Sequence, residues 1–165
     1  MEQLLIQALQ INGNNITEKT TKNKLPSDLD YEQCMRMILD IGTQIELLKE
    51  HGIGILFVTK NDVLQLSTGG YILNTDILSF KCNEKGEINI DKPFDTSIIG
   101  IAPELIKINQ LPSLVSYNVA YFSLKQLVLE VMQLDKIGQL EPTKLYYLIE
   151  RCSQENPSDR VFVLI

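Results

Sequence analysis

The sequence is poor in the residues on which many catalytic and metal sites depend. It contains one histidine, His51, and three cysteines, Cys34, Cys82 and Cys152. One histidine at a predicted helix end cannot easily complete a Ser-His-Asp set or a zinc site. The cysteines are far apart and form no Cys-x-x-Cys, which is typical of reduced structural thiols in a cytosolic or nuclear compartment. Cys82, in a polar stretch, is the one candidate reactive thiol, although a chance loop thiol is the simpler interpretation.

Long apolar runs and an excess of positive charge are also missing. No run approaches the roughly 18 apolar residues of a membrane helix, and the acidic start Met1-Glu2 is unlike a secretory signal. The net charge of −6 argues against general nucleic-acid binding. A hydrophobic content of 44% over 165 residues is that of an ordinary globular domain. We expect a single cytoplasmic domain over residues 1–165 that has no contact with membrane.

Apolar residues at helical spacing predict several helices. A short one covers residues 2–10, and Asp30 with Gln33 forms a capping box that opens a clearer amphipathic helix ending near Gly52. Residues 117–134, apolar on nearly all faces, predict a central helix. Pro142 suits the first turn of a last helix. The inward positions of the amphipathic helix are Cys34, Met37, Ile38, Ile41, Ile45 and Leu48.

Between these helices the pattern changes to short strands and polar loops. Residues 53–58, 63–66 and 71–73 are apolar runs, and Thr68-Gly69-Gly70 predicts a hairpin turn between the last two. Two polar stretches, 12–28 and 81–97, are predicted to be surface loops. The fold class expected is α+β, mainly α-helical, with one or two small β-hairpins. The last five residues, 161–165, are too apolar for a free tail and should dock.

One charged residue stands out in an apolar stretch. Glu104 lies within Ile98–Ile106, directly after Pro103. A carboxylate in such surroundings is tolerated when it is paired and hydrogen-bonded, because desolvating it alone is costly. Arg160, near the other end of the chain, is the candidate partner, and we expect the two side chains to lie within salt-bridge distance.

The order of elements resembles the C-terminal lobe of a eukaryotic protein kinase across nearly the whole chain. Ala102-Pro103-Glu104 is that family's Ala-Pro-Glu unchanged, and Pro157 and Arg160 match its closing motif, whose arginine pairs with the Ala-Pro-Glu glutamate. His51-Gly52-Ile53 is similar to the point where the long lobe helix enters the catalytic loop. Ser123 fits the central buried helix, but the usual aspartate of that helix falls on Ala120. The resemblance implies a C-lobe-like helical bundle.

The resemblance places non-catalytic residues at the catalytic positions. Phe57 stands where the family has the aspartate of His-Arg-Asp, Thr59 at the catalytic-loop lysine, and Asp62 at the metal-binding asparagine. Asp76 begins Asp-Ile-Leu where the family has Asp-Phe-Gly. Phosphoryl transfer needs a carboxylate base and magnesium ligands, and phenylalanine accepts no proton. Asp62 and Asp76 could ligate a cation, but two solvated turn acids are the simpler interpretation.

Neither a glycine-rich phosphate loop nor a strand bearing a phosphate-binding lysine precedes the lobe. The resemblance therefore implies a catalytically inactive C-lobe without an N-lobe, similar to the kinase non-catalytic C-lobe domain of Spire-type proteins. Such a module would act as a scaffold or protein-interaction domain, with a protein partner such as a basic peptide or tail, and without metal or cofactor.

Two alternatives remain open at this point. The first is a degenerate kinase lobe that binds a nucleotide or metal together with a separate N-lobe-like chain. The second is an unrelated α+β interaction or structural protein, for which Glu104 and Arg160 would lie far apart.

Overall fold

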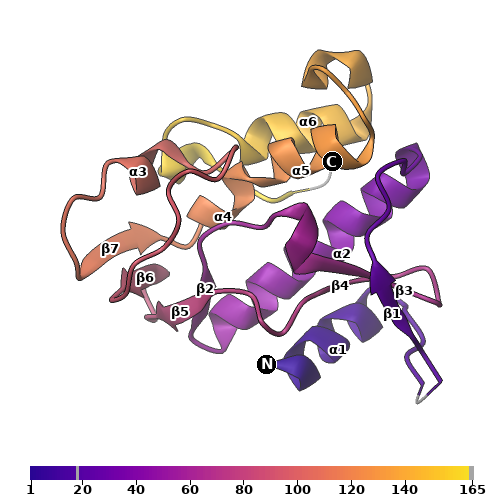
Figure 1. Ribbon diagram of the computed structural model, residues 1–165, viewed down its shortest axis with the longest axis horizontal. Coiled ribbons are helices and arrows are strands. Elements are labelled where there is room, and N and C mark those ends of the chain that lie inside the picture. The colour runs from indigo at the N-terminus through magenta and orange to yellow at the C-terminus, as the bar shows by residue number, and fades with distance from the viewer. Residues whose placement is uncertain (18, 164–165) are drawn as a thin grey trace.

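A computed structural model describes residues 1–17 and 19–163 (Figure 1). The helices are α1 (Glu2–Ile11), α2 (Tyr31–Glu50), α3 (Pro103–Ile106), α4 (Val119–Phe122), α5 (Leu124–Val131) and α6 (Lys144–Cys152), with 3₁₀ turns η1 (Lys60–Asp62), η2 (Ile137–Leu140) and η3 (Pro157–Asp159). The strands are β1 (Lys22–Lys24), β2 (Ile53–Ile55), β3 (Val63–Leu66), β4 (Tyr71–Leu73), β5 (Ser79–Cys82), β6 (Glu87–Ile90) and β7 (Ser113–Ser116).

The strands form two small antiparallel sheets. One has the order β1-β3-β4 and the other the order β2-β5-β6-β7. The hairpin predicted at Thr68-Gly69-Gly70 joins β3 to β4, and the Leu66 N–H donates to the Gly70 carbonyl. Gly69 has a φ of +86°. This left-handed conformation is easily reached by glycine, so the sequence specifies the turn.

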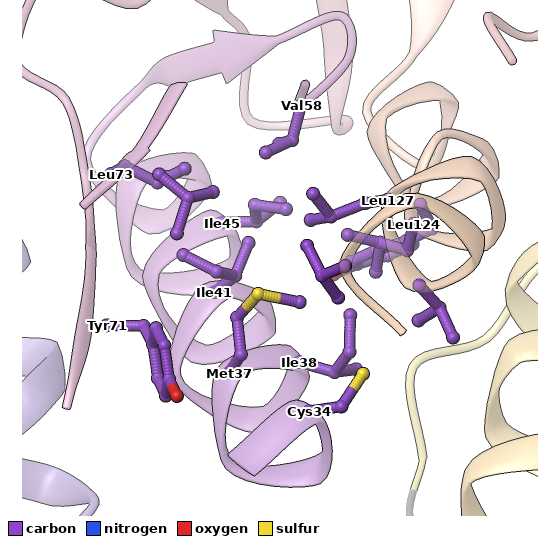
Figure 2. Close-up of a cluster of buried hydrophobic side chains, with 14 of the residues drawn as sticks. Cys34, Met37, Ile38, Ile41, Ile45, Val58, Tyr71, Leu73, Leu124 and Leu127 are labelled. Carbon is purple, nitrogen blue, oxygen red and sulfur yellow. The ribbon is translucent and has the colours of Figure 1, made fainter. Parts of the chain in front are cut away.

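Helix α2 is the centre of the larger hydrophobic core. Its capping box is present, because Asp30 Oδ1 accepts from the Gln33 N–H and Gln33 Oε1 accepts from the Asp30 N–H. All six inward positions predicted for this helix are buried. Figure 2 shows Met37, Ile41 and Ile45 of α2 between β4 and the α5 side chains Leu124 and Leu127. Helix α1 packs on α2, and α2 lies between α1 and the α5–α6 pair (Figure 1).

A second apolar cluster joins the four-stranded sheet to α3 and α4. It includes Phe80 of β5, Ile88 and Ile90 of β6, Leu105 of α3 and Val119 of α4. Apolar residues alternate with polar ones along β6, so that Ile88 and Ile90 share the buried face. This cluster anchors the segment that contains Glu104.

Both predicted surface loops contain strands, so that part of the sequence prediction was wrong. Strand β1 lies inside 12–28 and pairs with β3, while β6 and the end of β5 lie inside 81–97. The Asn83 side-chain oxygen accepts from the Lys85 and Glu87 N–H groups and turns the chain between β5 and β6. Strand β1 is short and entirely polar, so only its pairing reveals it, whereas β6 carries two alternating isoleucines within a polar stretch.

The central helix also differs from its prediction. Residues 117–134 form two shorter helices, α4 and α5, that meet at Ser123. The Ser123 hydroxyl donates to the Ala120 carbonyl, a local bond that competes with the regular helical pattern. With a four-stranded sheet and these divided helices, the fold is a mixed α and β structure, with more strand than the one or two hairpins expected.

The end of the described chain returns to α2. The Phe162 ring stacks on Tyr121, with 5.4 Å between ring centroids, and fills the space beside Gly42. Val161 and Val163 are exposed, and Leu164 and Ile165, also expected to dock, lie outside the described residues. Over the described ranges, no helix is both long enough and apolar enough to span a bilayer.

Candidate functional site

Glu104 and Arg160 form a bidentate ion pair. Arg160 Nη1 lies 2.5 Å from Glu104 Oε1, and Nη2 lies 2.9 Å from Oε2. The Arg160 side chain is fully buried, whereas that of Glu104 is 21% exposed. The structure thus places Glu104 against the partner assigned to it from sequence. A paired fork of this kind is among the stronger hydrogen-bonding arrangements in proteins.

The remaining donors of Arg160 bind backbone carbonyls. Its Nε donates to the Gln154 carbonyl at 2.6 Å, and Nη2 donates to that of Glu155 at 2.9 Å. The guanidinium carbon lies 4.8 Å from the centroid of the Phe122 ring. One buried cation therefore joins α3, the end of α4 and the loop that follows α6.

The loop that follows β2 holds an apolar residue, Phe57, where the sequence resemblance to kinases expects the catalytic base. Phe57 follows β2 and is buried in the second apolar cluster, together with Leu56. An aromatic ring cannot take a proton from a hydroxyl group. At this position the chain uses its side chain for packing.

Asp62 is committed to the local turn. Its Oδ2 accepts from the Thr59 N–H at 2.7 Å and from the Thr59 hydroxyl at 2.6 Å. The carbonyl of Asp62 accepts from the Asn74 N–H at 2.7 Å, which ties the turn to the end of β4. Thr59 and Asp62 therefore lie in direct contact, as two parts of one turn.

Asp76 is exposed in the turn between β4 and β5. Its N–H donates to the Asn74 side-chain oxygen at 3.2 Å, an Asx turn. Across residues 1–17 and 19–163, no three His, Cys, Asp or Glu side chains lie close enough together to hold a metal ion.

Sequence reasoning missed how Ser123 supports the loop. The Val58 N–H donates to Ser123 Oγ at 2.8 Å, and the hydroxyl donates onward to the Ala120 carbonyl at 2.7 Å. This buried relay connects the loop at Phe57 to the junction of α4 and α5. A serine within an apolar helix was a signal in the sequence. Nothing in the sequence indicated its partner Val58, which lies 65 residues away.

A cavity of about 470 Å³ lies beside the same loop. Lys24 from β1 and Lys60 from η1 line it, together with Asn61, Asn74 and the apolar residues Leu25, Val63 and Leu64. Lys60 also binds the Ser27 hydroxyl. Sequence reasoning missed the two lysines because they are brought together only by the pairing of β1 with β3.

A buried polar network fixes the hairpin β3–β4 against α2. Asp40 Oδ2 accepts from the Tyr71 N–H at 3.0 Å, and its Oδ1 accepts from the amides of Asn12 and Asn14. Gln44 donates to the Tyr71 carbonyl and accepts from the Leu73 N–H, each at 2.8 Å. Burial raises the pKa of the Asp40 carboxyl, against the lowering effect of these hydrogen bonds and of nearby Arg36. This network was also missed.

The thiols and the histidine carry no sign of catalysis. Burial raises the pKa of Cys34 and of Cys152 to about 12. Cys82, expected in a loop, lies in β5 and is buried, and burial raises its pKa as well. His51 caps the end of α2, with its Nδ1 2.8 Å from the Leu47 carbonyl. Since the thiolate is the reactive form, a raised pKa opposes reactivity at neutral pH.

Comparisons with known proteins give a structural match without a sequence match. No family model matches the chain, and neither does any curated protein. Among solved structures 265 chains match. One is ROP2 from Toxoplasma gondii, described as a virulence factor with a protein-kinase fold and no enzymatic activity.

The match to ROP2 has a TM-score of 0.58 at 14% sequence identity and covers 80% of this chain. The chain spans 40% of the length of that protein. An identity this low carries information about the fold alone. Together with the two sheets and the helices around α2, it shows that the chain has a protein-kinase-like fold.

Proposed function

We propose that residues 1–165 form a single, catalytically inactive domain, similar to a kinase C-lobe without an N-lobe, that serves as a protein-interaction or scaffold module. The observation that carries the proposal is the burial of Phe57, the residue that the sequence resemblance assigns to the position of the catalytic base. Phosphoryl transfer to a hydroxyl group needs a carboxylate there to orient the nucleophile and accept its proton.

The state of Asp62 supports the same conclusion. A carboxylate that holds magnesium must present its oxygens to the ion, whereas Asp62 Oδ2 already accepts two hydrogen bonds from Thr59. Asp76 is exposed, and within the described residues no three His, Cys, Asp or Glu side chains gather around a common point. The domain therefore works without metal or cofactor.

What the chain retains is structural. The Glu104–Arg160 pair, the Ser123 relay and both apolar clusters hold the loop and α3 in place. ROP2, with a protein-kinase fold and no enzymatic activity, is a precedent for such a fold without catalysis. A domain that keeps the core packing of its fold and lacks the catalytic residues is suited to binding other proteins.

The partner we propose is a protein with a basic segment or tail. The chain has 21 acidic against 15 basic residues, so long-range attraction favours cationic partners. The domain is expected to act in the cytoplasm and to bind neither nucleic acid nor membrane.

Capture followed by direct titration tests this proposal. The immobilised chain captures proteins from an extract, and each captured protein is then purified and titrated against the chain by calorimetry. We expect direct binding through a basic segment that weakens when the lysines and arginines of that segment are changed to glutamine. Absence of direct binding by every captured protein, or binding that survives that change, would overturn the proposed partner class.

A second candidate function rests on the cavity lined by Lys24 and Lys60. Two cations and two amides beside a kinase-like loop could hold the phosphates of a nucleotide when a separate N-lobe-like chain closes the site. Changing Phe57→Asp and adding an N-lobe in trans should then give measurable phosphoryl transfer. Continued inactivity of that mixture would exclude this candidate.

A further inference from the structure

Each of the two sheets has two edge strands, and these four edges differ in how they are covered or protected from pairing with another strand. The edge strands are β1 and β4 in one sheet, and β2 and β7 in the other. An open edge presents unpaired N–H and C=O groups and can pair with another strand. How each edge is closed therefore indicates where the molecule could accept one.

Side chains from α2 close the edge of β4. The Asp40 carboxylate accepts from the Tyr71 N–H, and the Gln44 amide binds both the Tyr71 carbonyl and the Leu73 N–H. Gln44 thus takes the place of a neighbouring strand. This edge is satisfied within the chain.

The edges of β1 and β2 are protected in other ways. Strand β1 is Lys-Asn-Lys with all three residues exposed, and lysines on an edge discourage pairing. Strand β2 has three residues, of which Gly54 and Ile55 are buried, and α2 packs against it.

Strand β7 has none of these protections. Its sequence, Ser-Leu-Val-Ser, contains no charge and no proline, and Leu114 is 59% exposed. Within the described ranges, no backbone hydrogen bond joins the outer edge of β7 to any other segment. Figure 1 shows β7 at the outer margin of the molecule.

The direction of the backbone groups on β7 follows from its pairing with β6. The Tyr117 N–H donates to the Gly86 carbonyl at 2.9 Å, in register with the β6–β7 ladder. Because backbone groups alternate along a strand, Ser113 and Val115 also point toward β6. The N–H and C=O groups of Leu114 and Ser116 therefore point outward.

We propose that two copies of this chain pair through β7, antiparallel, about a two-fold axis at Val115. When two identical strands pair antiparallel in one continuous sheet, the two-fold axis is perpendicular to that sheet. Two residues that lie opposite each other across the new pair therefore project from the same face of the sheet. An axis at Val115 places Leu114 opposite Ser116 of the partner subunit, and places Ser116 opposite Leu114 of the partner subunit. The four hydrogen bonds formed satisfy every outward N–H and C=O of Leu114 and Ser116.

This arrangement also covers the exposed leucine. The two Leu114 side chains become diagonal neighbours on one face of a continuous sheet, within reach of each other. Because the strand carries no charge, nothing in its side chains repels a second copy.

Sedimentation velocity over a range of concentrations tests the pairing. We expect a monomer–dimer equilibrium that Leu114→Lys and Leu114→Pro each weaken at least about tenfold in dissociation constant, which is about 1.4 kcal/mol. The first change adds like charges next to each other, and the second removes one outward N–H while leaving the ladder to β6. Ile11→Lys, at a 65% exposed isoleucine on α1, is the matched control and should leave the equilibrium unchanged.

Circular dichroism checks whether each variant is folded. If Leu114→Lys or Leu114→Pro is unfolded, the other Leu114 variant provides the test. A chain that is monomeric at every concentration would overturn the proposal. A dimer that both Leu114 variants leave intact, or that Ile11→Lys weakens as strongly, would overturn it as well.

Discussion

At the scale of single residues, Glu104 and Asp40 are stabilised in different ways. Glu104 faces a guanidinium that donates two hydrogen bonds to it. Asp40 accepts from backbone and amide groups, with Arg36 as the nearby cation, and burial raises its pKa. The first carboxylate is held by a buried charge of opposite sign, the second mainly by neutral donors, and their responses to mutation and pH should differ accordingly.

Removing the Glu104 carboxylate should be strongly destabilising. Glu104→Ala leaves Arg160 buried without its counter-charge, and we expect the free energy of unfolding to fall by about 3–5 kcal/mol in urea denaturation. The exposed pair of Glu2 and Lys22 provides the control, since Glu2→Gln should change stability little. A loss for Glu104→Ala no larger than that of the control would show that the ion pair does not hold the fold together.

The raised pKa of Asp40 predicts a dependence of stability on pH. The folded chain keeps the Asp40 proton over a pH range in which the unfolded chain has lost it. The contribution of Asp40 to the free energy of unfolding should therefore fall as pH rises from about 3.8 through the raised pKa. Asp40→Asn removes the titrating group and keeps an oxygen for the Tyr71 N–H.

Urea denaturation of both proteins at pH 4 and pH 7 checks this prediction. The stability of the wild-type chain relative to Asp40→Asn should be lower at pH 7 than at pH 4. A relative stability that is constant, or that increases toward pH 7, would contradict it.

At the scale of elements, α2 organises both its own packing and the edge of a sheet. Its apolar face forms the core in Figure 2, while Asp40 and Gln44 on another face bind the backbone of β4. One helix thereby fixes the position of the hairpin that follows the Phe57 loop.

Gln44→Ala should loosen that hairpin. The change leaves the buried Leu73 N–H and Tyr71 carbonyl without partners, and we expect a loss of about 1–3 kcal/mol. Hydrogen exchange should show faster exchange of the Leu73 amide. Gln10→Ala, at an exposed position on α1, is the control. Unchanged protection of Leu73 in Gln44→Ala would mean that the side chain does not close the edge.

The sequence predicted elements where local signals were strong. The capping box and the 3.6-residue period identified α2, and the Gly-Gly turn identified the hairpin β3–β4. Strand β1 is entirely polar and is defined by its pairing with β3, so no local pattern indicated it. Strands β6 and β7 are four residues long, and two apolar residues in each were too short a pattern to predict a strand. Glu104 and Arg160 could be matched because each is unusual in its own surroundings, whereas Lys24 and Lys60 are ordinary surface residues until β1 pairs with β3.

At the scale of the whole molecule, the chain has a protein-kinase-like fold, and our proposal is that the loop at Phe57 is not catalytic. The buried Phe57, the turn-bound Asp62 and the exposed Asp76 are the reasons to expect neither phosphoryl transfer nor magnesium-dependent nucleotide binding. The cavity beside Lys24 and Lys60 is the one observation that favours a nucleotide. The central claim is therefore best tested with a nucleotide.

The most direct test is the melting temperature of the chain with and without magnesium and ATP. A ligand at a hundredfold excess over its dissociation constant stabilises a folded protein by about 2.7 kcal/mol, which is about 5–10 °C for a chain of this size. An inactive interaction module should show no shift up to millimolar nucleotide. A saturable rise of several degrees that requires both magnesium and ATP would contradict the proposal of a non-catalytic domain.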